Sequence, residues 1–299
     1  MNIKHSLYGL LCGTLMLTSC SNDEPTAPGA QTVEASFSLN IAGEVATRAG
    51  NGNSSLGGAQ NLGAKNLNYI LALYEVADNN TLILSDFCQV SDRDGDGERF
   101  SPMVTLGKTY MMVALAHFGD RLTLTDAEKA DYLKAMPIEN IINSEAEDFY
   151  VATKTARFTA DNLQHALTLK RPYAKLRIVA TDWNQSAIES VEVNYADNTL
   201  FSQFNVLTNQ FSIDSATKTI SASQYNTSDD PTAKTIVADY FPVNADTYLS
   251  TFKVTVTFND NTSFSRTFND IPLHRNALTT LSGTFFSSPS PMKYDVTRD

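Results

Sequence analysis

The stretch FKVTVTF at positions 252–258 places an apolar side chain at every second residue, with Lys or Thr between. Successive side chains of a β-strand point to opposite faces of the sheet. The pattern therefore predicts a strand of an antiparallel sheet, with one face buried and the other in water. Asp260 and Asn261 follow directly, and they predict a tight turn into a partner strand.

Similar segments recur along the chain. Further strands are predicted at residues 69–76, 82–90, 110–118, 149–153, 163–169, 174–181, 188–195, 234–238, 263–268 and 278–286. Many short strands without regular helical crossovers favour β-sandwiches over a parallel α/β fold. We predict a mainly β protein with two tandem antiparallel β-sandwich domains, because Pro172 separates two series of strands and cannot donate to a ladder.

One helix interrupts the strands. Thr125 and Glu128 have the spacing of a capping box, in which each side chain satisfies a free backbone N–H group at the start of a helix. The helix is predicted to run over residues 127–136 and to end at Pro137. Ala130, Leu133 and Met136 would pack against the sheet, so the helix is interpreted as scaffold.

The first strand is followed by an unusual segment. Residues 33–41, VEASFSLNI, alternate at every step, and one face is predicted to be buried, with Val33, Ala35, Phe37, Leu39 and Ile41. Residues 50–58 are rich in Gly, Asn and Ser and predict a flexible loop, just after Arg48. One cut at an accessible Arg48 would detach this strand, although many arginines in such loops are simply solvated.

The N-terminus has the features of a bacterial lipoprotein leader. Lys4 precedes an apolar run at residues 7–17, and small residues precede Cys20. The run is too short for a permanent membrane helix, which needs roughly 20 residues. We therefore predict a signal peptide at residues 1–19, a lipid on Cys20, and a Pro- and Gly-containing leash after it. Lipidated Cys20 would anchor the chain to the outer membrane at the cell surface.

Composition excludes some classes of function. The 299-residue chain has a formal net charge of −11, and an acidic surface repels nucleic-acid phosphates. Cys12 would leave with the leader and Cys20 would carry lipid, so no disulfide is expected, and Cys88 is interpreted as a core thiol. No phosphate loop, nucleophile elbow or metal-binding histidine spacing is present, so we predict neither an enzyme nor a cofactor.

Two motifs and the features above together resemble the fimbrillin-like lipoproteins, the subunits of type V pili. The first motif is LKRPYAKLRI at residues 169–178, and the second is IPLHRNALTTLSG at residues 271–283. With the leader and the first strand, they span nearly the whole mature chain.

The resemblance implies two transthyretin-like β-sandwiches, acylation of Cys20, and cleavage between Arg48 and Ala49 by an arginine-specific protease. The cut would remove the first strand, and a strand from another pilus subunit would insert in its place. The implied segments are a signal peptide at 1–19, a lipidated leash with the detachable strand at 20–48, sandwiches at 49–171 and 172–287, and a tail at 288–299.

The tail departs from the family pattern. It is short and contains Pro289 and Pro291, so it is a poor candidate for a long donor strand. Stalk, tip and anchor roles therefore remain open. An alternative is a surface lipoprotein that stays tethered through Cys20 and binds a glycan or another ligand.

Two further sites were considered. Asp92, Asp94 and Asp96 occupy the first, third and fifth positions of a calcium-loop pattern, but Met103 stands where a bidentate carboxylate is needed. This segment is interpreted as an acidic turn, with weak calcium binding as the alternative. Ser215, between Asp214 and Ala216, resembles an O-glycosylation site of exported proteins.

Overall fold

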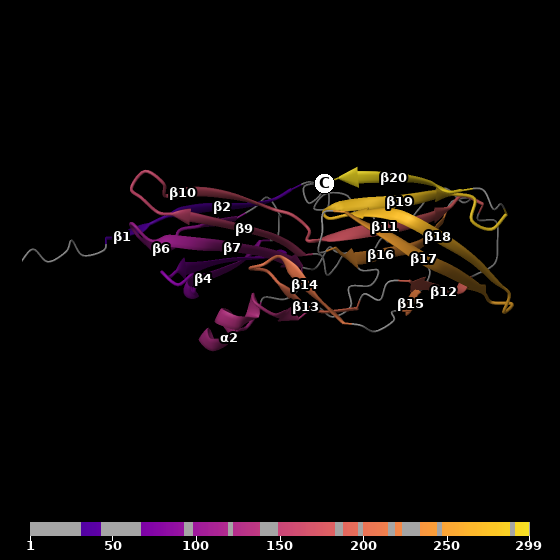
Figure 1. The fold of residues 1–299 in the computed structure, drawn as a ribbon, viewed down its shortest axis with the longest axis horizontal. Helices are drawn as coiled ribbons and strands as arrows, with labels where there is room; N and C mark the ends of the chain where they lie inside the picture. The colour runs from indigo at the N-terminus through magenta and orange to yellow at the C-terminus, as the bar shows by residue number, and fades with distance from the viewer. Residues whose placement is uncertain are drawn as a thin grey trace, which may run out of the picture.

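The protein forms an elongated, mainly β structure with two groups of strands arranged along its long axis (Figure 1). The computed structural model describes residues 31–42, 67–92, 98–118, 122–137, 149–182, 188–196, 200–214, 219–222, 234–243, 247–287 and 291–298. The N-terminal group lies at one end, and the C-terminal group lies at the other.

The N-terminal group contains two facing layers. One sheet has the order β4 (Leu82–Asp92), β3 (Leu67–Val76), β7 (Thr109–Phe118) and β9 (Phe149–Arg157), all antiparallel. The other has the order β10 (Gln164–Leu169), β2 (Ser36–Ile41) and β5 (Glu98–Phe100), and beside it β1 (Thr32–Glu34) pairs with β6 (Met103–Thr105). The side chains between these layers form one hydrophobic core.

The C-terminal group has the same architecture. One sheet has the order β16 (Lys234–Pro242), β11 (Tyr173–Ala180), β19 (Ala277–Gly283) and β20 (Lys293–Arg298). The other has the order β15 (Thr219–Ala222), β12 (Ile188–Tyr195), β17 (Thr247–Phe258) and β18 (Ser263–His274). A second core lies between them.

The two groups repeat one topology. In the N-terminal group, β2 pairs in parallel with β10 and antiparallel with β5. In the C-terminal group, β11 pairs in parallel with β19 and antiparallel with β16. The second sheets also correspond strand for strand, β4-β3-β7-β9 with β15-β12-β17-β18. Strand β20 is an addition, because it covers the edge of β19, whereas β10 ends its sheet.

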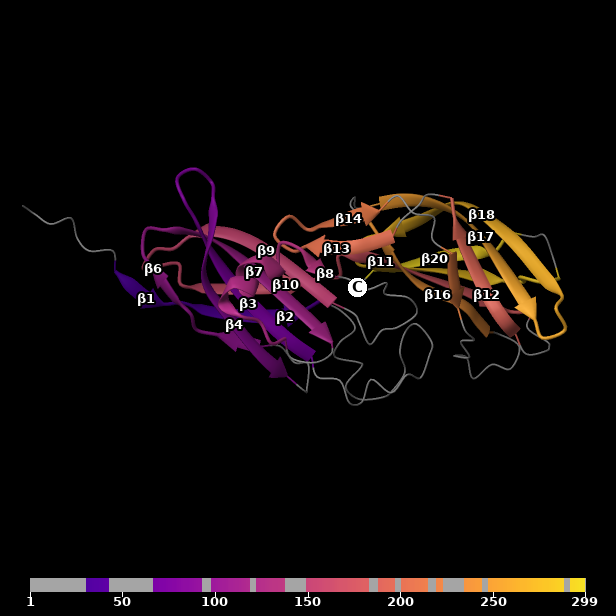
Figure 2. The same ribbon diagram turned by 90° about the horizontal axis from the view of Figure 1, so that it is seen from below.

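A small sheet and a third core connect the two groups. β13 (Leu200–Asn205), from the C-terminal half, pairs with β14 (Gln210–Asp214) and with β8 (Met136–Pro137), from the N-terminal half. Phe149 of β9 packs against Phe204 of β13 with ring centroids 5.4 Å apart. Both views show β13 and β14 next to the junction (Figure 2).

The two motifs that carried the family resemblance meet at this junction. The backbone N–H of Arg171 donates to Asn276 Oδ1 at 2.8 Å, and the N–H of Asn276 donates to the carbonyl oxygen of Tyr173 at 3.0 Å. The Arg171 side chain is buried and lies over the ring of Tyr150, 5.2 Å from its centroid. These motifs therefore have a structural role in joining the two groups of strands.

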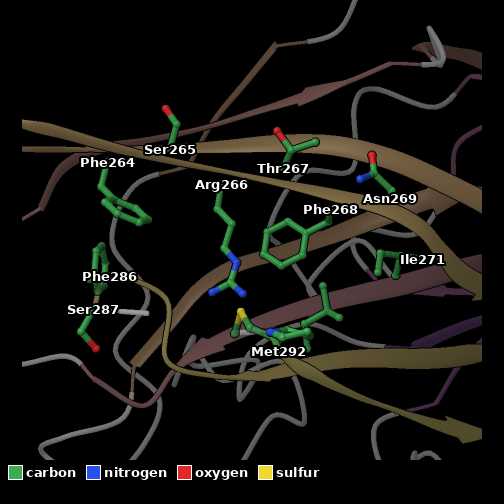
Figure 3. Close-up of a pocket in the computed structure, with 12 residues that line it drawn as sticks. Phe264, Ser265, Arg266, Thr267, Phe268, Asn269, Ile271, Phe286, Ser287 and Met292 are labelled. Atoms are coloured by element: carbon green, nitrogen blue, oxygen red, sulfur yellow. The ribbon is translucent and has the colours of Figure 1, made fainter. Parts of the chain in front are cut away.

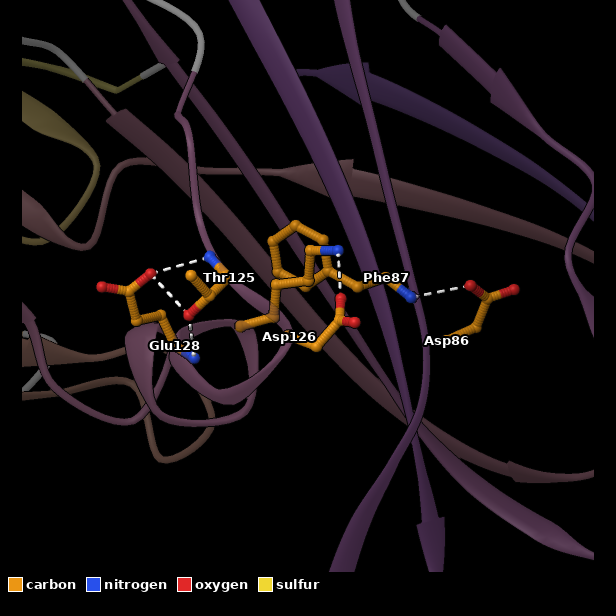
Figure 4. Close-up of polar contacts among 6 residues, drawn as sticks. Asp86, Phe87, Thr125, Asp126 and Glu128 are labelled. Carbon is orange, nitrogen blue, oxygen red and sulfur yellow. Dashed lines mark hydrogen bonds and ion pairs between the residues drawn. The ribbon is translucent and has the colours of Figure 1, made fainter.

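The helix is shorter than the sequence indicated. α2 covers Asp126–Tyr132, and its capping box is complete: Glu128 N–H donates to Thr125 Oγ1, and Thr125 N–H donates to Glu128 Oε2 (Figure 4). Leu133 and Met136 are buried as expected, but beyond the helix. Backbone pairing with β13 ends the helix before Pro137, because it makes residues 136–137 a strand.

The predicted β fold is confirmed, and every predicted strand coincides with a strand of the structure. In β17, Phe252, Val254 and Val256 are buried, as their alternation predicted. Asn261 adopts a positive φ of 62°, and the turn closes with a 2.9 Å hydrogen bond from Phe258 N–H to the carbonyl oxygen of Thr262. The strand predicted at residues 33–41 is divided into β1 and β2, and the strands that were not predicted are β5, β6, β8, β13, β14, β15 and β20.

Candidate functional site

The candidate site is the position that strand β2 occupies in the sheet, between β10 and β5, and we call it the seat of β2. This strand lies between two neighbours, in parallel register with β10 and antiparallel register with β5, so that Phe37 is opposite both His165 and Phe100. Hydrogen bonds continue beyond its ends, from Ser36 N–H to the carbonyl oxygen of Leu163 at 2.7 Å and from Ala42 N–H to that of Leu169 at 2.9 Å. β2 is therefore an internal strand whose removal opens a gap in the sheet.

The side chains of β2 fill the core on one face only. Ala35, just before the strand, and Phe37 and Leu39 within it have no exposed surface, and Val33 and Ile41 are partly buried. This is the face that the alternating sequence predicted. Small, aromatic and aliphatic side chains thus enter the core at every second position. The seat of β2 therefore offers a row of apolar pockets for side chains and a hydrogen-bonding strand edge on each side for the backbone.

An aromatic group surrounds Phe37. Its ring stacks on His165 at 5.5 Å between centroids and contacts Phe158 at 6.1 Å, and His165 meets Phe158 at 4.8 Å. His165 is 4% exposed, as expected for a packed histidine. Burial lowers its pKa below the usual value; Lys154 adds to that shift, and the backbone at Asn162 opposes it.

Strand β20 is held differently from β2. Among the strands that the structure describes, it pairs only with β19, and its residues 293–297 are exposed or only partly buried, with Tyr294 at 57% exposure. Met292, directly before the strand, is buried and packs beside Gly283. β20 is thus attached by its backbone ladder and by one buried side chain, and it ends near the middle of the molecule (Figure 1).

A carboxylate secures the chain ahead of β20. Asp182 accepts backbone N–H groups from Phe285, Phe286 and Ser287 at 2.7–2.8 Å and also the Ser287 hydroxyl at 2.8 Å. Burial alone raises the pKa of Asp182, but these four hydrogen bonds outweigh it and leave the pKa below its ordinary value. No sequence pattern predicted this role.

A groove of about 610 Å³ lies between β18 and the segment that leads to β20. Phe264, Phe268 and Phe286 supply apolar walls, and the guanidinium of Arg266 points from β18 toward Met292 (Figure 3). Arg266 Nη1 donates to the carbonyl oxygen of Thr284 at 2.6 Å. The groove therefore combines one cation with aromatic surface.

Most predicted site residues lie outside the described residues: Cys20, Arg48, Ala49, Asp94, Asp96 and Ser215. Asp92 is the last residue of β4. The described residues include no cluster of three His, Cys, Asp or Glu side chains that could hold a metal ion. The predictions for lipidation, processing, calcium and glycosylation therefore stay predictions.

Cys88 is half-buried on β4 beside the N-terminal core. Burial and then the nearby Asp86 raise the pKa of its thiol to about 11, which disfavours the reactive thiolate at neutral pH. Among the described residues, no helix has the length and apolar character needed to cross a membrane.

Comparison with solved structures reveals the same fold in other proteins. A candidate cell adhesion protein from Bacteroides uniformis aligns with a TM-score of 0.52 at 11% identity, covering 89% of this chain and 98% of that one. A candidate cell adhesion protein from Bacteroides ovatus aligns with a TM-score of 0.50 at 13% identity, covering 91% and 97%. These alignments extend over both groups of strands.

Sequence comparison adds the family. No curated protein sequence matches the chain. One family model matches residues 25–298, which includes β1 to β20 and thus both sandwiches. The chain belongs to the family described as a family of unknown function, DUF6562.

Proposed function

We propose that this protein is a structural cell-surface protein, a fimbrillin-like pilus subunit or assembly component, with β2 as its removable strand. Cleavage between Arg48 and Ala49 would separate β1 and β2 from the rest of the chain, and a strand from another subunit would take the seat of β2. Two sandwiches, divided between residues 171 and 172, would form the body of the subunit.

The observation that carries this proposal is the contrast between β2 and its counterpart β11. Both are first core strands with parallel and antiparallel neighbours. Residues 181–187 connect β11 to β12, whereas residues 42–66 connect β2 to β3 and include Arg48. No disulfide could hold β2 to the rest of the protein after cleavage at Arg48, because Cys88 is the only cysteine after residue 20.

Removal of β2 would leave a strong acceptor for a strand. The pockets of Phe37 and Leu39 would lose two fully buried side chains, each worth roughly 1.5–3 kcal/mol. The facing edges of β10 and β5 would lose their backbone partners as well. A strand with the same apolar alternation would restore both contributions, as in strand addition to an open sheet edge.

The sequence also suggests two further partners, the outer membrane and a protease. Lipid on Cys20 would anchor the precursor in the outer membrane, and an arginine-specific protease would release it. The fold similarity to candidate cell adhesion proteins supports a role at the cell surface. We propose no enzymatic activity, no cofactor and no nucleic-acid partner for this chain.

The groove beside Arg266 favours a second candidate function. A groove with aromatic walls, polar side chains and the guanidinium of Arg266 in its described lining suits a ligand that has both an apolar part and an anionic group. In this alternative the chain keeps residues 20–48 and stays a tethered binding protein. The groove makes no use of β2, so the two candidates differ in the fate of the N-terminus.

Mass-spectrometric mapping of the N-terminus tests the proposal on protein recovered from the outer surface of its native cells. A mature chain that begins at Ala49 is the expected result. A lipidated chain that begins at Cys20 and retains β2 would contradict strand removal and favour the tethered binding protein.

A further inference from the structure

His165 occupies the seat of β2 in an unusual chemical setting. Its ring lies between Phe37, on the strand proposed to leave, and Phe158, which stays with the body of the sandwich. It is 4% exposed, and neither ring nitrogen has a hydrogen-bond partner among the described residues. A histidine in such a place is packed as a neutral aromatic ring, because a buried imidazolium without a partner is costly.

The charges around His165 also disfavour its protonation. Lys154 of β9 is the charged group that acts on its pKa, and the backbone at Asn162 is the one polar group that opposes the shift. Tyr110 of β7 lies behind Phe158, and its hydroxyl accepts the N–H of Thr105. The acidic residues on the neighbouring elements are Glu34, Glu98 and Asp161. Glu34 and Asp161 are exposed, and Glu98 accepts the backbone N–H of Arg99 at 3.0 Å.

We propose that neutral His165 helps to hold β2 in the sheet and that protonation of its ring favours release of the strand. We call this contact the clasp. With β2 in place, Phe37 covers the ring and keeps it neutral. When β2 leaves, that face of the ring becomes open to water and the imidazolium can form. Opening therefore takes up a proton, and a lower pH favours the open state by mass action.

The sign and size of the effect follow from linkage. The pKa of His165 is lowered in the closed state, so its contribution to closure is complete above the pKa of the exposed group, about 6.5, and falls at lower pH. One proton changes an equilibrium by at most tenfold per pH unit. Between pH 7.5 and pH 5.0, the equilibrium constant for opening of β2 rises by at most about 30-fold.

Hydrogen exchange of the uncut chain measures this opening directly. The amides of residues 37–41 report on β2, and those of residues 111–117 in β7 report on unfolding of the whole sandwich. After correction for the intrinsic exchange rate, the equilibrium constant for opening of β2 should rise by up to about 30-fold from pH 7.5 to pH 5.0. Opening of β7 should also increase, because unfolding of the whole sandwich exposes both His165 and His117.

Two variants separate His165 from other titrating groups. His165→Phe keeps the aromatic packing and removes the titration, so its β2 opening should change less than threefold between the two pH values. His117 of β7 also has a pKa lowered by burial, but it bonds the carbonyl oxygen of Phe118, so His117→Gln should behave like the natural chain at β2. Equal pH dependence in His165→Phe and the natural chain would overturn the proposal.

An NMR titration of the natural chain keeps the test decisive if His165→Phe does not fold. The pKa of the His165 ring should lie below 6.5 while β2 is closed, so its signals should titrate at a lower pH than those of an exposed histidine. A ring that titrates near pH 6.5 in the closed state would also overturn the clasp.

The clasp serves the proposed strand exchange, but it is measured without it. If the opening of β2 does not depend on pH, the proposed role of His165 is wrong, but the proposal of strand exchange still stands. Conversely, a chain found uncut on its native cells would contradict strand exchange, while the hydrogen-exchange result would still stand as a property of the fold.

Discussion

Phe37 is the residue on which the attachment of β2 depends most. It has no exposed surface and contacts both His165 and Phe158. Phe37→Ala should destabilise the N-terminal sandwich by about 3–5 kcal/mol, because it removes a buried aromatic ring and leaves a cavity. Urea unfolding measures the loss. Asn40→Ala, at an exposed position of the same strand, should change stability by less than about 0.5 kcal/mol.

Asp182 holds the segment before β20 through its charge. Asp182→Asn should destabilise the C-terminal sandwich by about 1 kcal/mol at pH 7, an amount reduced by the partial exposure of the carboxylate. Because the pKa of Asp182 is lowered in the folded state, its contribution is present above about pH 4 and is lost as the pH falls below that.

Thermal unfolding at pH 7 and pH 3 checks this prediction. The two chains should differ at pH 7, and the difference should be smaller at pH 3. Glu189→Gln, an exposed carboxylate on β12, serves as the control and should match the natural chain at both values. A difference that persists unchanged at pH 3 would show that Asp182 acts through shape alone.

At the scale of elements, helix α2 is a supporting part. Its capping box (Figure 4) and the exposed Lys129–Asp126 pair at 2.8 Å fix its first turn. Lys129 also lies over the ring of Phe87 on β4, 5.9 Å from its centroid. Thr125→Ala should cost about 1 kcal/mol, because an N–H group at the helix start loses its partner.

Asp126→Asn is the matched control for the helix. It removes only an exposed ion pair and should cost less than about 0.5 kcal/mol. Neither substitution should change hydrogen exchange in β2. Faster exchange of β2 in Thr125→Ala would mean that α2 supports the site more directly than its position indicates.

Sequence patterns predicted those elements that bury one regular face. β2 and β17 alternate strictly, and the structure buries the expected residues of each. β5, β6 and β8 are two- or three-residue strands, too short for any periodicity to appear. β20 has six residues but nearly all are exposed, because backbone pairing with β19 specifies it and side-chain burial does not.

The helix shows a second limit of sequence patterns. Leu133 and Met136 have helical spacing from Ala130, but their burial comes from the contact with β13, some 65 residues later. For the same reason, the sequence predicted only part of the candidate site. The buried face of β2 is local information, whereas the stacking of His165 on Phe37 depends on the register between strands far apart in the sequence.

At the scale of the whole molecule, aromatic and hydrogen-bond contacts join the two sandwiches at the junction. Phe204 of β13 contacts Phe149 of β9, and the N–H of Phe149 donates to the hydroxyl of Tyr173 at 3.1 Å. The natural chain should therefore unfold in a single calorimetric transition.

Phe204→Ala should weaken this coupling by about 3–5 kcal/mol and separate the calorimetric transition into two. Phe252→Ala, in the core of the C-terminal sandwich, should lower stability by a similar amount without weakening the junction itself. Two separate transitions already in the natural chain would contradict a rigid junction.

The central claim is that β2 is a replaceable strand, and peptide exchange tests it most directly. A chain with a site-specific protease sequence in place of residues 45–49 is cut and mixed with an isotopically labelled peptide of residues 31–42. The labelled peptide should replace β2 in the cut chain and not in the uncut chain, and a peptide with Ala in place of Phe37 should compete poorly. A cut chain that never takes up the labelled peptide, or that unfolds once β2 is free, would contradict the account.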